Sequence, residues 1–335
     1  MPSPALLPEL QSAPQLVGIA RIAAAGESLR EGHNVEYFTL GIRSLLCRVV
    51  SWRQLPFAWA INPYRGCEFS CKYCYARYTH EFMELRDGVD FERKIFVKQH
   101  AAQLMRQELR RVAAGEGIAI GTATDPYQPA ERRFEVTRAI LEELARHSGL
   151  DIGIVTKSNL VTRDVELLRD VGRNNRLTVS LTVTTVDTAL ARILEPRAPR
   201  PDLRLEAVRQ LNLAGVRTGV NCAPVLPQIT DRPRDLESLV KAAADAGAKF
   251  IFANPLFLKP CAAAVFLPFV DEHFPALSKF YRERYAGRAF LPRGYAERIT
   301  HMVRNLRQKY GIRSGDERGR QPAFSIMADE QLRLF

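Results

Sequence analysis

Residues 56–260 alternate between short apolar runs and longer amphipathic stretches, and no other feature of the sequence constrains the fold as strongly. Six runs have the length and the β-branched content of strands: Phe57–Ile61, Ile118–Thr122, Ile152–Thr156, Leu177–Val183, Thr218–Ala223 and Phe250–Ala253. Six further stretches have the apolar spacing of helices: Lys98–Ala114, Phe134–Ser148, Thr162–Val171, Val186–Leu194, Asp202–Ala214 and Arg234–Ala246. Six β-then-α units in succession predict an α/β fold with a parallel sheet and crossover helices.

These units predict a core at residues 56–260, flanked by segments of a different character. We expect residues 1–55 to form an irregular N-terminal extension, 261–310 a helical segment and 311–335 a flexible tail. The pattern suits an open (β/α)6 barrel and a doubly wound sheet equally, and in both folds ligands bind at the carboxyl ends of the strands. No apolar run reaches the roughly 18 residues that a membrane span needs. No secretory signal is visible, so we expect a cytoplasmic protein.

Three cysteines, Cys67, Cys71 and Cys74, follow the first predicted strand with the spacing C-x3-C-x2-C, and the loop from residue 62 to residue 75 holds no further cysteine or histidine. A structural zinc ion needs four closed protein ligands. Three thiolates on a four-iron cluster instead leave one iron free to bind a small molecule. A zinc knuckle that borrows a distant fourth ligand, or three buried structural cysteines, remain alternatives.

The cysteine loop, with Tyr73 directly before its last cysteine, resembles that of the radical S-adenosylmethionine (SAM) superfamily. The resemblance implies an open (β/α)6 barrel and a 4Fe-4S cluster on Cys67, Cys71 and Cys74, whose open iron binds SAM. It also implies an electron donor that reduces the cluster. Reductive cleavage of SAM would then release a 5′-deoxyadenosyl radical that abstracts hydrogen from a substrate.

Four segments, at 62–82, 118–140, 154–168 and 177–226, resemble the spore photoproduct lyase branch of this superfamily. The resemblance implies that Thr124 and Asp125 lie at the amino-acid end of SAM, that Lys157 pairs with its carboxylate and that Ser180 contacts it. Each residue also has an ordinary structural explanation. Thr124-Asp125 can be a turn that caps a helix, Lys157 can be a surface lysine, and Ser180 can belong simply to a strand.

One position departs from the lyase pattern. In the lyase a cysteine at the position of Thr122 returns a hydrogen atom to the product radical, assisted by two tyrosines that correspond to Tyr73 and Tyr75. The threonine O–H bond is too strong for this transfer, so the sequence predicts that this chain is not itself a spore photoproduct lyase. Cys222, at the end of the fifth predicted strand, is a candidate replacement thiol.

The net charge of +11 favours an anionic partner, such as nucleic acid. Arg65 and the pair Arg132-Arg133 are candidates for phosphate contacts near the mouth of the site. The terminal residues Gln331–Phe335 resemble the peptide by which repair proteins bind a DNA sliding clamp. We therefore expect a nucleic-acid or nucleotide substrate. The alternatives are a radical enzyme that modifies a protein or a small metabolite, and a non-enzymatic zinc-binding module.

Overall fold

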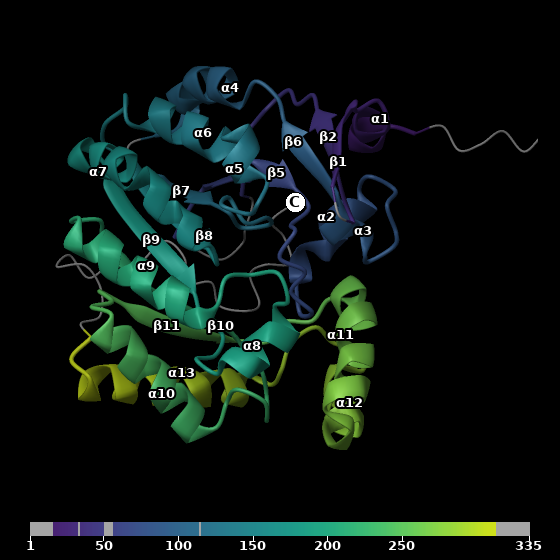
Figure 1. The fold of residues 1–335 in the computed structure, drawn as a ribbon, viewed down its shortest axis with the longest axis vertical. Helices are drawn as coiled ribbons and strands as arrows, with labels where there is room; N and C mark the ends of the chain where they lie inside the picture. Colours follow the sequence, from purple (N-terminus) through teal and green to yellow (C-terminus); the bar gives the residue numbers. More distant parts are fainter. Residues whose placement is uncertain (1–15, 33, 50–55, 114, 313–335) are drawn as a thin grey trace, which may run out of the picture.

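The computed structural model describes residues 16–32, 34–49, 56–113 and 115–312. These residues form a large and a small β-sheet, with helices packed around them (Figure 1).

The large sheet has the strand order β11-β10-β9-β8-β7-β4-β3. Its strands are β3 (Cys47–Arg48), β4 (Trp59–Ile61), β7 (Gly117–Ile120), β8 (Asp151–Thr156), β9 (Arg176–Thr182), β10 (Thr218–Val225) and β11 (Ile251–Pro255). All neighbours from β4 to β11 pair in parallel, and only the edge strand β3 is antiparallel. The six predicted strands are confirmed. Because they lie side by side in chain order without the reversal of a doubly wound sheet, they form the sheet of an open (β/α)6 barrel.

Helices between successive strands cover the outer face of this sheet (Figure 1). They are α4 (Ala101–Glu108), α6 (Val136–Leu144), α7 (Val165–Asn174), α8 (Thr188–Leu194), α9 (Pro201–Leu213) and α10 (Pro233–Asp245). In β9, Leu177, Val179 and Leu181 belong to the main apolar core. The alternate residues Thr178 and Ser180 therefore face the barrel interior. This alternation gives β9 a polar face toward the barrel interior, and Ser180 lies on it.

The small sheet has the order β1-β2-β6-β5 and differs from the expected irregular extension. It comprises β1 (Ser28–Gly32), β2 (Val35–Leu40), β5 (Tyr64–Arg65) and β6 (Lys94–Lys98), with helix α1 (Gly18–Ala24) beside it. Leu40 and Phe96 pack with Ala23 and Met83 on one of its faces. Strand β2 pairs in parallel with β6, far along the chain, so local sequence patterns could not reveal the sheet. Its strand β5 leads directly into the cysteine loop.

Three helices follow the barrel, as predicted for 261–310: α11 (Pro260–His273), α12 (Ser278–Tyr285) and α13 (Arg293–Lys309). Helix α13 packs against β11 and α10, and its residues Ile299 and Val303 join the main core. Within the described residues, no helix combines the length and the apolar character required to cross a membrane. The segment Gln331–Phe335 lies outside the described residues, so its docking on a sliding clamp stays a prediction.

Candidate active site

A cavity of about 190 Å³ lies at the carboxyl ends of the barrel strands. Eight of the ten predicted site residues line it: Cys67, Cys71, Tyr73, Cys74, Tyr75, Thr124, Asp125 and Lys157. They come from the loops after β4, β7 and β8, which are far apart in the sequence. The two predicted residues that do not line the cavity are Ser180 and Cys222.

The cysteine loop begins at Gly66, whose backbone conformation excludes a larger residue. Its φ is +84°, and an added Cβ would lie 2.7 Å from the carbonyl oxygen of Lys94 and 2.9 Å from that of Phe91. The Gly66 carbonyl accepts hydrogen bonds from Thr124 Oγ1 at 2.6 Å and from Gln128 Nε2 at 3.1 Å. The loop after β7 thus fixes the backbone just before the first cysteine.

The three cysteines are free thiols on the cavity wall. Burial raises the pKa of each of them above its usual value, to about 12 for Cys71. In the part of the chain that the structure describes, no three His, Cys, Asp or Glu side chains gather closely enough to hold a single metal ion. Sulfurs spread around one cavity suit a cluster in which each thiolate binds a different iron.

Tyr73 is anchored behind the loop by a buried ion pair. Its hydroxyl donates to the carboxylate of Glu195 and lies 3.0 Å from Thr184 Oγ1. Glu195 pairs with Arg204, and each of these two side chains is 1% exposed. Burial alone would raise the pKa of Glu195, but Arg204 and Lys157 lower it below the usual value, so the carboxylate is charged. The phenol group therefore points away from the cavity, toward a structural anion.

Arg204 is a site residue that the sequence analysis missed. Its guanidinium donates to the carbonyl of Pro199 at 2.7 Å and to that of Thr182 at 3.0 Å, so it joins the end of β9 to α9. A signal was present in the sequence. Arg204 occupies the buried face of α9 together with Ala207 and Leu211, where an unpaired charge would be costly.

Lys157 directly follows β8 and has its ammonium group 5.6 Å from the centre of the Tyr73 ring. Burial lowers its pKa, but Cys71 and Glu195 raise it more, so the net pKa lies above the usual value. No acidic side chain of the described residues forms an ion pair with it. The backbone N–H of Lys157 donates to Asp125 Oδ2 at 2.6 Å, and Thr156 Oγ1 donates to Asp125 Oδ1 at 2.6 Å. Asp125 thereby holds the lysine in place through its main chain.

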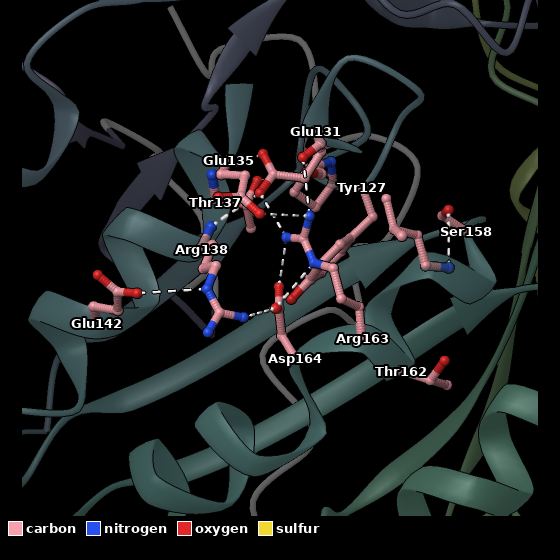
Figure 2. Close-up of polar contacts among 12 residues, drawn as sticks. Tyr127, Glu131, Glu135, Thr137, Arg138, Glu142, Ser158, Thr162, Arg163 and Asp164 are labelled. Atoms are coloured by element: carbon pink, nitrogen blue, oxygen red, sulfur yellow. Dashed lines mark hydrogen bonds and ion pairs between the residues drawn. The ribbon is translucent and has the colours of Figure 1, made fainter. Parts of the chain in front are cut away.

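A second layer of charged residues supports these strand ends (Figure 2). Glu131 on α5 (Glu131–Phe134) accepts from Tyr64 at 2.5 Å and from Arg163 at 3.1 Å. Arg163 also donates to Asp164 at 2.9 Å, and Arg138 reaches Asp164 from the other side at 2.6 Å. The network joins β5 to the segments that follow β7 and β8. It stiffens the frame that carries Thr124, Asp125 and Lys157.

Several polar atoms inside the barrel lack partners. Thr178 Oγ1, Ser180 Oγ and Asn221 Oδ1 are buried without a hydrogen bond among the described residues. Asn221 lines the cavity, whereas Ser180 lies deeper in the barrel and does not. Because buried polar atoms normally have partners, this arrangement fits a polar ligand. The sequence analysis missed Asn221, although an asparagine inside a strand is an unfavourable choice that calls for a reason.

Cys222 is not positioned as the sequence analysis expected. Its neighbours Asn221 and Ala223 line the cavity, so Cys222 points to the opposite face of β10 and joins the main apolar core. It is 1% exposed, and burial raises its pKa to about 12. The geometry does not support a hydrogen-donor role for this thiol. Tyr75 does line the cavity, and its hydroxyl donates to the carbonyl of Thr122.

Comparison with known proteins agrees with this geometry. The Radical SAM superfamily matches residues 61–241, more than half of the 335 residues. The chain belongs to the radical SAM superfamily. It is therefore a radical SAM enzyme, a class that uses SAM together with an iron–sulfur cluster.

Two relatives of this radical SAM enzyme are uncharacterized proteins. One, from Mycobacterium tuberculosis, is 34% identical over 309 residues, which cover 92% of this chain and 89% of the relative. The other, from Methanocaldococcus jannaschii, is 28% identical over 173 residues, covering 52% and 62%.

Among solved structures, the enzyme resembles spore photoproduct lyase. A lyase variant with bound AdoMet and dinucleoside spore photoproduct has a TM-score of 0.62 and 17% identity, covering 90% of this chain and 85% of that chain. The lyase complexed with dinucleoside spore photoproduct alone has the same TM-score and identity. At this identity the likeness shows a shared fold.

Proposed function

We propose that this enzyme holds a 4Fe-4S cluster on Cys67, Cys71 and Cys74 and acts in the cytoplasm on a nucleic-acid or nucleotide substrate. One observation carries the first part of the proposal. Three unbonded cysteines share a cavity with Lys157, a half-buried cation that forms no ion pair with an acidic side chain in the described part of the chain. Bound together and reduced by an electron donor, the cluster and SAM supply a 5′-deoxyadenosyl radical that abstracts hydrogen.

The chain's own residues provide a matching cradle for SAM. Lys157 pairs with the SAM carboxylate. Thr124 Oγ1 donates to Gly66 and accepts one bond from Gln128, which leaves one lone pair for the SAM ammonium group. Ser180 and Asn221 supply the polar atoms that lack partners deeper in the barrel. The Tyr75 ring, 5.9 Å from that of Phe257, provides an apolar wall for the adenine.

The reaction that follows differs from that of spore photoproduct lyase. Within the described residues, the cavity wall carries no thiol beyond the three of the cysteine loop. Thr122 occupies the position of the lyase donor, and Cys222 faces the core. The hydroxyl groups of Tyr73 and Tyr75 are both engaged in hydrogen bonds. We therefore propose a radical reaction that does not end with return of hydrogen from a cavity thiol.

Anaerobic reconstitution tests the proposal. We expect about four irons per chain, brown colour and, after reduction with SAM, 5′-deoxyadenosine detected by chromatography. Cys67→Ala, Cys71→Ala and Cys74→Ala should each lose iron and product. The matched control is Cys47→Ala, a half-buried cysteine on β3 outside the cavity wall, which should keep both. Full iron content in the three loop variants, or stoichiometric zinc in the wild type, would refute the proposal.

A further inference from the structure

A second hollow, of about 470 Å³, lies next to the catalytic cavity. Its walls are residues 227–231 after β10, one side of α12, and residues 291–298 at the start of α13. We call this hollow the rim groove. Its size allows it to hold a part of a substrate that lies outside the catalytic cavity.

The rim groove and the cavity are lined by neighbouring parts of the chain. Ala223 and Pro224, near the end of β10, line the cavity, and Pro227 and Gln228 of the loop that follows line the groove. On the other side, the Phe257 ring of the cavity wall stacks on the Phe290 ring at 4.5 Å, directly before the groove residue Leu291. The groove is thus linked to the cavity wall in two ways, along the chain after β10 and through the stacked rings.

Two arginine–aromatic pairs line the groove. The guanidinium of Arg284 lies 5.6 Å from the centre of the Phe280 ring, and that of Arg298 lies 5.0 Å from the Tyr295 ring. The groove's acid, Asp231, accepts from the Gln228 backbone at 2.7 Å and from the Tyr295 hydroxyl at 2.8 Å. Arg298 approaches Asp231 only to 3.9 Å, and Arg284 forms no ion pair with any described residue.

The segment around the groove is strongly basic. Residues 278–309 contain nine lysines and arginines and only two glutamates, a net charge of +7 out of +11 for the whole chain. The same segment contains five aromatic residues. Basic side chains that attract phosphates, interleaved with rings on which bases can stack, are the combination that nucleic-acid strands recognise.

We infer that the rim groove binds the strand that flanks the target nucleotide, while the target itself enters the catalytic cavity. This inference rests on the proposed nucleic-acid substrate and adds the surface that recognises it. Arg284 and Arg298 contact backbone phosphates, and each guanidinium–ring pair offers a planar surface on which a neighbouring base can stack. An acidic peptide would satisfy the arginines but would leave the aromatic faces unused.

The test is salt-dependent binding of a fluorescent 20-nucleotide single-stranded DNA to the reconstituted full chain, measured by anisotropy. The variant Arg284→Gln/Arg298→Gln removes two exposed charges. Loss of two phosphate contacts should lower the slope of log K against log salt by roughly 1.4, since each contact on a single strand contributes about 0.7. We expect affinity to fall at least about tenfold at low salt.

The control variant Arg169→Gln/Arg173→Gln makes the same change in net charge on α7, across the molecule from α12 (Figure 1). These two side chains are 45% and 68% exposed. We expect the control variant to retain most of the wild-type affinity. Equal losses in both variants, or wild-type binding by the groove variant, would overturn the inference. The inference would also be overturned if the wild type bound polyglutamate tightly and did not bind DNA, and if the groove variant lost the polyglutamate binding.

Radical chemistry is measured separately, as 5′-deoxyadenosine formed by the wild type without DNA. Absence of 5′-deoxyadenosine would refute the proposed function without affecting the DNA-binding result. Unchanged DNA binding by the groove variant would refute only the role of the rim groove.

Discussion

Replacing Arg204 by methionine removes the cation from the buried ion pair behind Tyr73. Both partners are 1% exposed, so the variant strands the Glu195 carboxylate in the interior. Breaking a buried pair in this way costs roughly 3–5 kcal/mol. The same variant also removes the donors to the carbonyls of Thr182 and Pro199, which places the expected cost at the upper end.

The measurement is urea unfolding of cluster-free protein, because a bound metal would add its own binding free energy. With a slope of about 3 kcal/mol/M, a cost near the upper end of that range should lower the midpoint by roughly 1.7 M. The double variant Glu195→Gln/Arg204→Met removes both charges and leaves an amide oxygen for the Tyr73 hydroxyl. It should recover a large part of the loss, since an uncharged pair carries no desolvation penalty.

An exposed pair serves as the control. Arg200 and Asp202 pair at 2.7 Å with side chains that are 56% and 53% exposed, so Asp202→Asn should cost no more than about 1 kcal/mol. The reasoning is refuted if Arg204→Met unfolds within 1 kcal/mol of the wild type, or if the double variant is no more stable than the single one. Either result would mean that the pair does not determine how the cysteine loop is held.

Three further predictions follow from the same geometry. Burial lowers the pKa of His80 to about 4, so between pH 6.5 and 4 only the unfolded chain binds a proton at this imidazole. The free energy of unfolding should therefore fall by about 3 kcal/mol over that window. His80→Phe should show a smaller fall when unfolding midpoints are compared at pH 7.5 and 4.5. Gly66→Ala should lower the iron content, whereas Gly215→Ala, at φ +85° with no atom within 4 Å of the added Cβ, should not; equal iron in both would contradict the packing argument. Asp125→Asn replaces by an amide the carboxylate that now accepts three hydrogen bonds. Calorimetry should then show SAM binding about tenfold weaker. An unchanged Kd would reject the positioning role of Asp125.

The barrel could be predicted because each strand and helix leaves a local signal in the sequence. The small sheet could not, because β2 pairs with β6, and three other strands, β3, β4 and β5, lie between them in the chain. Strand ends could be located but not the direction of each side chain, since a shift of one residue moves a side chain to the opposite face. Cys222 illustrates this limit: Asn221, one position earlier, faces the cavity instead.

The residues missed by the sequence analysis are those whose meaning depends on a distant partner. The role of Arg204 becomes clear only in the structure, where its guanidinium forms an ion pair with Glu195. Lys157 and Thr124 were found only because family resemblance supplied partners that the sequence alone could not provide. The rim groove could not be predicted from composition for a similar reason. The net charge of the whole chain does not indicate where in the folded molecule the charged side chains gather.

The charges around the cavity explain why a ligand with both an anionic and a cationic group fits there. The Glu195 carboxylate is neutralised by Arg204, and that of Asp125 is taken up by hydrogen bonds from Tyr127, Thr156 and Lys157. Neither is free to neutralise the Lys157 ammonium. The surrounding charges keep Lys157 protonated, yet no acidic side chain of the described residues pairs with it directly, and an incoming carboxylate would supply that direct partner. When the ligand carboxylate pairs with Lys157, the ligand ammonium group lies beside hydroxyl and carbonyl oxygens, to which it donates hydrogen bonds.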